Sequence, residues 1–327
     1  MTSPTPGCDG AAETEPTLDP GLRAWLDRVN HAQSEGRRRG VPDTPESARM
    51  GLATLTRTQG GHGPKLAHVQ DIHVGPTGVP VRLYDPQPGV AKGVCVFLHG
   101  GGHMAGSVDV YDPICRRLAA ATERLVASVD YRLAPEHPYP AGLADALAVL
   151  NHLPQALALE GHELTGQMAL AGDSGGGALA ATLATITRRH PSIVLDRLVL
   201  IYPSLDYTLE QPSLDENGRG YLLETEKIRW YFDHYFQHNE DRQQASPLYL
   251  PMDGLPPTLV VTAGLCPLRD EGFAYVHRLA DAGVPHEHLH MPGLIHAYLN
   301  LHELVPDACT RTYAAIGGFL RRRMARS

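Results

Sequence analysis

A serine set between glycines is the feature of this sequence with the clearest chemical potential. Residues 172–176 are Gly-Asp-Ser-Gly-Gly, a form of the Gly-x-Ser-x-Gly pattern. The apolar stretch 167–171 before it predicts a buried strand, and the helix formers at 178–187 after it predict a helix. Strand, glycine-flanked serine and helix together predict a nucleophile elbow, a tight turn that exposes the serine oxygen at a helix amino terminus. Ser174 is therefore the candidate nucleophile, and the alternative is a glycine-rich loop with an incidental serine.

A run of glycines earlier in the chain could supply a second catalytic part. The apolar residues 94–98 predict a central strand covered on both faces, and residues 99–103, His-Gly-Gly-Gly-His, follow directly. Without side chains in the way, backbone N–H groups can approach a ligand, as an oxyanion hole requires. A flexible glycine turn is the alternative. Because an elbow follows about 70 residues later, the run favours an oxyanion hole.

Position along the chain singles out one of the 18 histidines. In hydrolases with such an elbow the triad order is serine, acid, histidine. Residues 293–296, Gly-Leu-Ile-His, occupy the expected loop after the last strand, which predicts His296 as the general base. His286, His288 and His290 alternate along an expected strand, so a zinc site is an alternative function for them. No fourth ligand is apparent, and we predict no metal.

The elements that must position these residues alternate between strand and helix patterns. This alternation predicts an α/β fold with a doubly wound, mostly parallel sheet and a helical cap. Residues 204–244 interrupt the alternation with an aromatic-rich helical segment that we expect to cover part of the site. The predicted parts are a disordered tail (1–19), amino-terminal cap helices (20–68), a hydrolase core (69–203 and 245–327) and a cap insertion (204–244).

Composition limits the partners and the compartment. The chain has 327 residues and a net charge of −8 without a basic stripe, which argues against a nucleic-acid partner. No apolar run approaches the roughly 20 residues needed for a membrane span, and the first residues lack a secretory signal pattern. The five cysteines are widely spaced and odd in number, which argues against a disulfide framework. We therefore predict reduced thiols and a cytoplasmic location.

Together, these motifs resemble the hormone-sensitive-lipase-like branch (bacterial family IV) of the α/β-hydrolases, the bacterial carboxylesterases. The resemblance spans roughly residues 70–320. The matching segments are His99-Gly-Gly-Gly102, Asp130-Tyr-Arg-Leu-Ala-Pro-Glu-His-Pro-Tyr-Pro-Ala141, Gly172-Asp-Ser-Gly-Gly176, Ser246-Pro-Leu248, Pro267-Leu-Arg-Asp-Glu-Gly272 and Gly293-Leu-Ile-His296.

The resemblance implies a role for each matching site residue. Ser174 is then the nucleophile and His296 the base, and the oxyanion hole consists of the N–H groups of Gly101, Gly102 and Gly175. The resemblance also implies the α/β-hydrolase fold, with a cap over a short or medium acyl pocket, and a small-molecule ester or acyl substrate. It implies no metal or organic cofactor, and it leans towards a homodimer.

One residue departs from the family pattern. The family has Asp-Pro-Leu-x-Asp-Glu, in which the first aspartate is the triad acid, and this sequence has Cys266 in that place. A thiol is a weak acceptor and is mostly uncharged near neutrality. Asp270 is our tentative replacement, with Glu271 as a second choice, although both carboxylates also suit a helix amino terminus.

The function predicted from these residues is a serine hydrolase that cleaves small carboxylic esters through an acyl-enzyme. With Cys266 in the acid position, a slow Ser–His dyad is one alternative to a replaced acid. A biosynthetic lyase or acyltransferase on the same scaffold is a second alternative, and a catalytically silent ligand-binding protein is a third.

Overall fold

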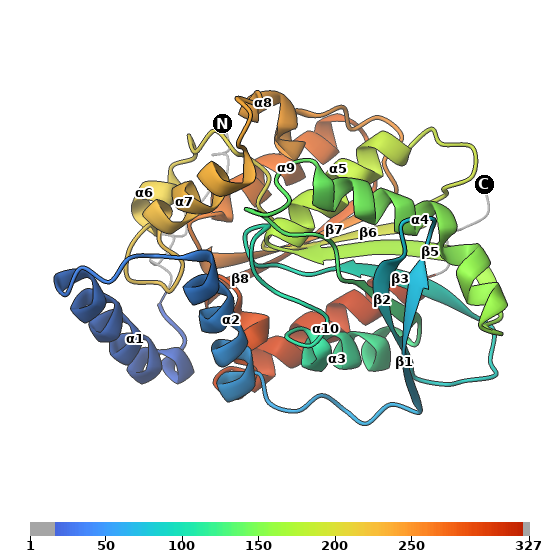
Figure 1. Cartoon of the computed structure of the whole chain (residues 1–327), viewed down its shortest axis with the longest axis horizontal. Helices are drawn as coiled ribbons and strands as arrows, with labels where there is room; N and C mark the ends of the chain where they lie inside the picture. The colour runs from blue at the N-terminus through green and yellow to red at the C-terminus, as the bar shows by residue number, and fades with distance from the viewer. Residues whose placement is uncertain (1–16, 323–327) are drawn as a thin grey trace, which may run out of the picture.

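An eight-stranded sheet runs through the middle of the protein, which we describe from a computed structural model over residues 17–322 (Figure 1). The strand order is β1-β2-β4-β3-β5-β6-β7-β8. Strands β1 and β2 pair antiparallel to each other, β2 pairs antiparallel to β4, and all other neighbours are parallel. The sheet is therefore mostly parallel, as predicted. Of the expected disordered tail, residues 1–16 lie outside the described residues.

The strands are β1 (His68–Val74), β2 (Val79–Asp85), β3 (Lys92–Leu98), β4 (Leu125–Val129), β5 (Leu164–Asp173), β6 (Arg197–Ile201), β7 (Thr258–Leu265) and β8 (His286–Ile295). The α-helices are α1 (Pro20–Arg38), α2 (Pro45–Gln59), α3 (Asp112–Thr122), α4 (Ala141–Leu159), α5 (Gly175–Thr187), α6 (Ser213–Glu216), α7 (Thr225–Tyr235), α8 (Arg242–Ala245), α9 (Arg269–Asp281) and α10 (Pro306–Arg321). Two short 3₁₀ helices are η1 (Pro247–Tyr249) and η2 (Tyr298–Leu301).

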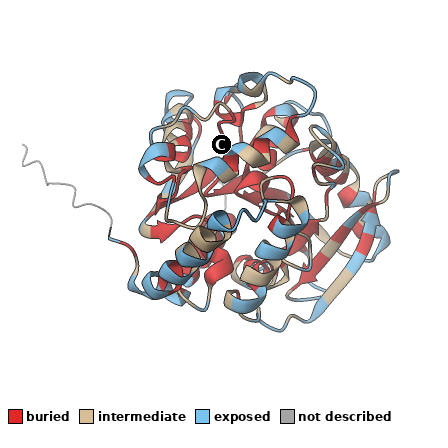
Figure 2. Ribbon diagram, turned by 60° about the vertical axis from the view of Figure 1, so that its left-hand side comes forward, coloured by how far each residue is buried: buried red, intermediate tan, exposed pale blue. Residues whose placement is uncertain are grey.

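Helices cover both faces of the sheet, and this explains the unbroken apolar runs in the strand sequences. Along β3, residues 94, 96 and 98 pack into the core on the side of α4, α5 and α9, whereas residues 95 and 97 pack into the core with α3 and α10. Figure 2 shows the same layering, with buried strands at the centre and the exposed surface on the outer faces of the helices. The long helix α3 was not anticipated from the sequence.

The two segments predicted to form a cap lie against each other at one end of the sheet, on the left in Figure 1. Asn30 of α1 donates a hydrogen bond to the carbonyl of Gly220 over 2.9 Å. Arg49 of α2 reaches the loop after β4, where its guanidinium contacts Glu136 at 2.9 Å. These contacts fix α1 and α2 beside the insertion and the core. None of the helices within residues 17–322 is long and apolar enough to span a membrane.

Candidate active site

The turn between β5 and α5 has the geometry that an exposed nucleophile requires. Ser174 has φ 51° and ψ −121°, a strained conformation for a residue with a side chain. Its N–H donates to the carbonyl of Ile201 over 2.9 Å, which holds the turn against β6. A Cβ on Gly172 would lie 2.2 Å from the Gly176 oxygen, and one on Gly176 would lie 2.0 Å from the Leu98 oxygen. Only glycine therefore fits at positions 172 and 176, two residues before and two residues after Ser174.

The predicted nucleophile and the predicted base meet in space. Ser174 Oγ lies 2.8 Å from His296 Nε2, although 122 residues separate them. The edge of the Tyr202 ring packs at His296, with the ring centroids 5.0 Å apart. Burial lowers the pKa of His296 to about 3, so the ring is neutral at pH 7. A neutral imidazole in hydrogen-bonding contact with a hydroxyl can accept its proton.

Cys266 lies on the opposite side of the imidazole. Its Sγ is 3.2 Å from His296 Nδ1, and the N–H of Leu268 donates to the same sulfur over 3.3 Å. The thiol is only 1% exposed, and burial raises the pKa of Cys266. The group that touches Nδ1 is thus a neutral thiol, which is a weak acceptor and brings no negative charge.

The two carboxylates considered as replacements point elsewhere. Asp270 Oδ2 accepts from the N–H of Ser213 over 2.9 Å, and its Oδ1 accepts from the Arg269 guanidinium over 2.7 Å. Glu271 Oε2 accepts from the N–H groups of Leu205 and Asp206 over 2.6 and 3.0 Å. Both lie in the first turn of α9, where they tie the cap insertion and the segment after β6 to the core. The structure does not bring Asp270 or Glu271 to His296, so the tentative assignment of Asp270 as the acid is not supported.

The three predicted oxyanion donors gather around one space. Gly101 and Gly102 have φ values of 121° and 61°, which glycine adopts without strain. A Cβ on Gly175 would lie 3.4 Å from the N–H nitrogen of Gly102, so the elbow and the glycine loop are in contact. Among residues 17–322 the N–H groups of Gly101, Gly102 and Gly175 have no hydrogen-bond acceptor. These donors border the cavity that also contains Ser174 and His296.

This cavity, of about 980 Å³, lies between the core and the cap. Most of its wall is apolar, from side chains of α1, α2 and α7 that include Trp25, Leu52 and Ile228. Tyr231 of α7 packs directly on the oxyanion loop, since a Cβ on Gly102 would lie 2.6 Å from the Tyr231 ring. The cavity can therefore hold a small apolar molecule with one end beside Ser174.

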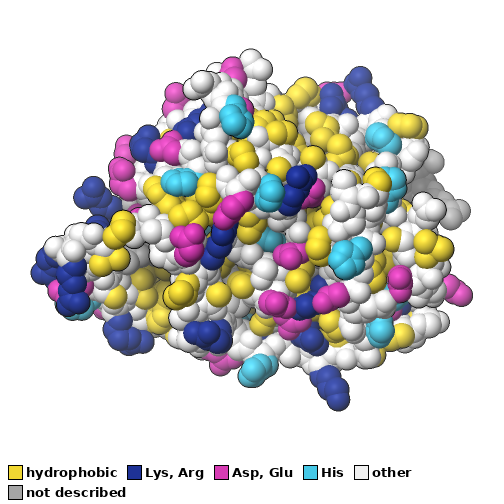
Figure 3. Space-filling view, in the orientation of Figure 1, with side chains coloured by type: hydrophobic (Ala, Val, Ile, Leu, Met, Phe, Trp, Pro, Cys, Tyr) yellow, Lys and Arg dark blue, Asp and Glu magenta, His cyan; other side chains and the backbone are white. Residues whose placement is uncertain are grey.

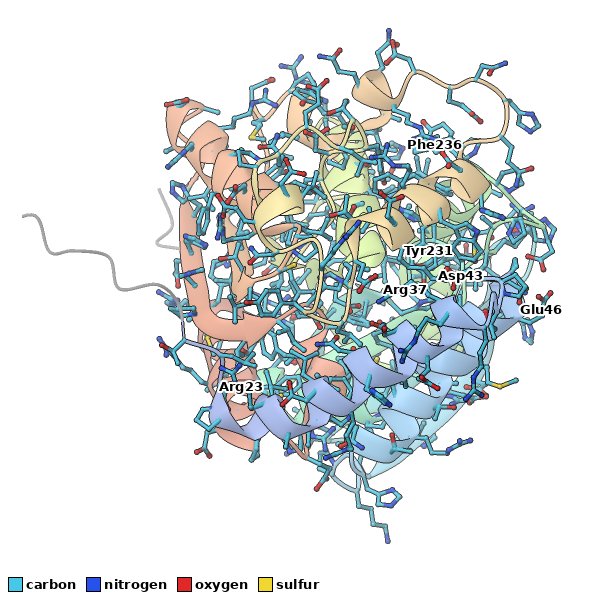
Figure 4. The ribbon with its side chains drawn as sticks, turned by 90° about the vertical axis from the view of Figure 1, so that its left-hand side faces the viewer. Arg23, Arg37, Asp43, Glu46, Tyr231 and Phe236 are labelled. Carbon is cyan, nitrogen blue, oxygen red and sulfur yellow. The ribbon has the colours of Figure 1, made fainter. Side chains whose placement is uncertain are left out.

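Ion pairs join the two halves of the cap at the rim of the cavity. Arg37 of α1 pairs with Glu224 at 2.8 Å, and Lys227 of α7 pairs with Asp43 at 2.6 Å. Figure 4 shows Arg37, Asp43 and Tyr231 where α1 and its connection to α2 face α7. In the space-filling view, Lys and Arg side chains gather at the left, over α1, with hydrophobic side chains exposed between them (Figure 3).

The alternating histidines of β8 have local partners. His288 Nε2 and His290 Nδ1 lie 2.8 and 2.9 Å from the hydroxyl of Thr262, and His286 Nδ1 lies 2.9 Å from the carbonyl of Val284. Within residues 17–322 no group of three or more His, Cys, Asp or Glu side chains could hold a metal ion. The described site holds no ligand set for a metal.

Two residues at the site were missed by sequence reasoning as functional candidates: Asp173 and Tyr202. Asp173 occupies the variable position of the Gly-x-Ser-x-Gly pattern, and an acidic residue at a buried strand end is the signal that could have found it. Tyr202 lies within the strand predicted over residues 195–203 and directly after β6 in the structure, without a motif of its own. Tyr231 was expected to cover part of the site, but its contact with Gly102 depends on how the cap meets the core.

Comparisons with known proteins find related hydrolases of the same fold. A family profile described as alpha/beta hydrolase fold matches residues 95–300. Esterase LipI of Mycobacterium tuberculosis (strain ATCC 25618 / H37Rv) is 37% identical, over 94% of this chain and 96% of its own length. Carboxylesterase NlhH of the same strain is 34% identical, over 98% of this chain and 99% of its own. The solved structure of ester-hydrolase EH1AB1 from the metagenome of Lake Arreo, complexed with a derivative of bipyridine phosphonate, has a TM-score of 0.84 and 31% identity. It covers 93% of this chain and 98% of its own.

Proposed function

The chain belongs to the hormone-sensitive-lipase-like family of α/β-hydrolases and is a carboxylesterase-type enzyme; from this premise we propose that it cleaves small carboxylic esters through an acyl-enzyme on Ser174. The observation that carries the proposal is the 2.8 Å contact between Ser174 Oγ and His296 Nε2, in a cavity bordered by backbone N–H groups that have no acceptor in the described part of the chain. The apolar wall and the 980 Å³ volume suit a small ester with a short or medium acyl group.

The proposed reaction has two halves. Ser174 Oγ attacks the ester carbonyl while His296 Nε2 takes the hydroxyl proton, and the N–H groups of Gly101, Gly102 and Gly175 donate to the oxyanion. His296 returns the proton to the leaving alcohol, which leaves the acyl group on Ser174. A water molecule then gives its proton to Nε2 and attacks the acyl carbon, and the carboxylic acid leaves as Ser174 recovers its proton.

We assign Cys266 to the acid position as an orienting group without charge. For Nε2 to accept the serine proton, the proton of the neutral ring must lie on Nδ1 and point at the sulfur of Cys266. A neutral sulfur holds this tautomer weakly and does little to stabilise the imidazolium that forms in the reaction. The proposal is therefore a functional Ser–His pair with a slow chemical step.

A cytoplasmic location and a homodimer remain predictions from the sequence. The four cysteines in the described part of the chain are unpaired and buried, which supports a reducing compartment.

The test compares the wild type with Ser174→Ala, using p-nitrophenyl butyrate and a fluorophosphonate probe. We expect the substitution to abolish labelling and to lower kcat by about 10²- to 10⁴-fold, less than the roughly 10⁶-fold loss in a hydrolase with an intact triad, because the neutral Cys266 already slows the wild type. Ser128→Ala, which changes a buried serine on β4 outside the cavity, is the control. Turnover and labelling that survive in Ser174→Ala would contradict the proposal. Ester or amide products formed only with an added alcohol or amine would favour the acyltransferase alternative.

A further inference from the structure

A buried carboxyl group sits between the nucleophile elbow and the oxyanion loop. Asp173 is the last residue of β5, directly before Ser174, and is 1% exposed. Its Oδ1 accepts from the N–H of Gly100 over 2.6 Å, and its Oδ2 accepts from the hydroxyl of Tyr111 over 3.1 Å. Gly100 immediately precedes the oxyanion donors Gly101 and Gly102. One side chain thus connects the strand that carries the nucleophile to the loop that would bind the oxyanion.

We propose that Asp173 is a positioning residue for the oxyanion hole: its carboxylate holds Gly100 against the elbow so that the next two N–H groups face the substrate carbonyl, and its protonation loosens this hold. The proposal deepens the esterase function proposed above and rests on it. It concerns the geometry of the donors, since Asp173 itself touches neither the base nor the reacting atoms.

The glycine loop needs such an anchor because three consecutive glycines have high conformational freedom. Tyr131 fixes the residue before the run, since its hydroxyl donates to the His99 carbonyl over 2.6 Å. At Gly100 a Cβ would lie 2.7 Å from Asp173 Oδ2, so glycine is what permits the carboxylate to approach this closely. Beyond Gly100, the loop closes on itself through the N–H of Ala105, which donates to the Gly101 carbonyl over 2.9 Å.

The groups that face Asp173 are neutral, so charge on the carboxylate is balanced by hydrogen bonds alone. They are Tyr111 and Cys115 of α3, Tyr131 after β4 and Tyr202 after β6, and burial raises the pKa of each one. Burial also raises the pKa of Asp173, to about 7, against the opposing effect of the Gly100 and Tyr111 donors. When the carboxyl group is protonated, its hydrogen bonds lose their charge-assisted character and weaken.

Protonation of Asp173 can be distinguished from protonation of the base. Burial lowers the pKa of His296 to about 3, so this ring is neutral throughout the range in which Asp173 titrates. A fall of kcat/KM below pH 7 therefore reports the carboxyl group beside the loop rather than the imidazole.

The kinetic test measures kcat/KM for p-nitrophenyl butyrate from pH 5 to 9 in the full-length wild type, in Asp173→Asn and in Tyr111→Phe. We expect the pH profile of the wild type to have an acidic limb that begins near pH 7. Well below that pH, kcat/KM should fall about tenfold for each pH unit. Asp173→Asn should be at least about tenfold slower at pH 8 and lack this limb. Tyr111→Phe removes a donor to the carboxylate and should move the limb to higher pH. Asp145→Asn, at a buried aspartate that pairs with Arg132 away from the cavity, should keep the wild-type profile.

A second readout does not depend on activity. In protein labelled with ¹⁵N-glycine, the short Gly100 bond predicts a downfield N–H resonance that titrates with a midpoint near pH 7 and disappears in Asp173→Asn. A limb that stays at the same pH in both variants, or the lack of such a resonance, would overturn the positioning role. Absence of ester hydrolysis together with a titrating Gly100 resonance would count against the esterase function alone and support the anchor.

Discussion

The two nitrogens of His296 face different chemistry, and the difference shows which parts of the site are built for charge. On the Nε2 side, Ser174 lies at 2.8 Å, and the neighbouring oxyanion loop is anchored by the carboxyl group of Asp173. On the Nδ1 side, the partner is the neutral Cys266 thiol at 3.2 Å. The site thus has a carboxyl group next to the loop that would bind the oxyanion. It has only a neutral thiol next to Nδ1 of the imidazole ring, which becomes positively charged in the reaction.

Strand register explains why the ring keeps its place despite this asymmetry. Leu265 and Ile295 are partners in the parallel pairing of β7 and β8, so the residues that follow them, Cys266 and His296, emerge side by side. In the same way, Asp173 pairs with Ile201 of β6, which fixes the elbow that follows. Geometry at the site therefore comes from the sheet, and the acid position can change its chemistry without displacing the base.

The largest effect is expected from restoring charge on the Nδ1 side. In Cys266→Asp, a carboxylate would accept a strong hydrogen bond from the Nδ1–H group, fix the productive tautomer and stabilise the imidazolium. We predict that kcat for p-nitrophenyl butyrate rises by between about 10²- and 10⁴-fold, the range spanned by general-base assistance and by loss of a triad acid. Steady-state kinetics and the rate of fluorophosphonate labelling both measure this change.

Cys266→Ser is the matched control for that substitution, because it supplies oxygen without charge. We expect its kcat to stay within about tenfold of the wild type. If Cys266→Asp folds but reacts with the fluorophosphonate probe no faster than the wild type, the group beside Nδ1 does not limit the reaction. That result would contradict the proposed difference between the two sides of the ring.

A smaller effect, on stability, is expected from the carboxyl group on the serine side. The pKa of Asp173 is raised by burial from 3.8 to about 7, so between these values the unfolded chain is ionised at this residue and the folded chain is protonated. The folded state then binds more protons, and the free energy of unfolding falls as pH rises. The contribution lost by pH 8 is on the order of 4 kcal/mol, and Asp173→Asn should abolish this dependence.

Urea unfolding at several pH values from 4 to 8 measures this difference. The exposed Asp253→Asn variant is the control, and its free energy of unfolding should follow the wild type across the range. Equal pH dependence in the wild type and Asp173→Asn would mean that the carboxyl group is ionised in the folded protein at all these pH values. The charge beneath the oxyanion loop would then be permanent.

The sequence predicted the mostly parallel sheet, the elbow and the choice of His296, because local patterns determine these features. The strand-serine-helix pattern and the position of His296 after the last strand need no knowledge of distant contacts. The acid could not be predicted in the same way. Asp270 comes four residues after Cys266, but its direction depends on Ser213 in the insertion, which is distant in sequence. The Asp173–Gly100 anchor likewise joins residues 73 apart, so no local pattern marks it.

The smallest effect is expected at the rim of the cavity, remote from both sides of the ring. Lys227 pairs with Asp43 at 2.6 Å and lies 3.9 Å from the centre of the Trp230 ring, so it holds the α1–α2 connection on α7. An ion pair with one exposed partner is worth about 0.2–1 kcal/mol. Lys227→Met should therefore raise KM by roughly 1.5- to 5-fold through a less fixed wall, and leave kcat unchanged. The KM of the wild type should rise towards that of the variant in high salt, which screens the pair.

The control is Arg189→Met, which removes a more exposed ion pair, with Asp253, outside the cavity wall. Its KM and salt dependence should equal those of the wild type. A fall in kcat for Lys227→Met would contradict the separation proposed here, because it would mean that the Lys227–Asp43 pair also sets the chemistry at His296. The natural route for that influence is Tyr231, which lies on the same helix as Lys227 and packs against Gly102 of the oxyanion loop.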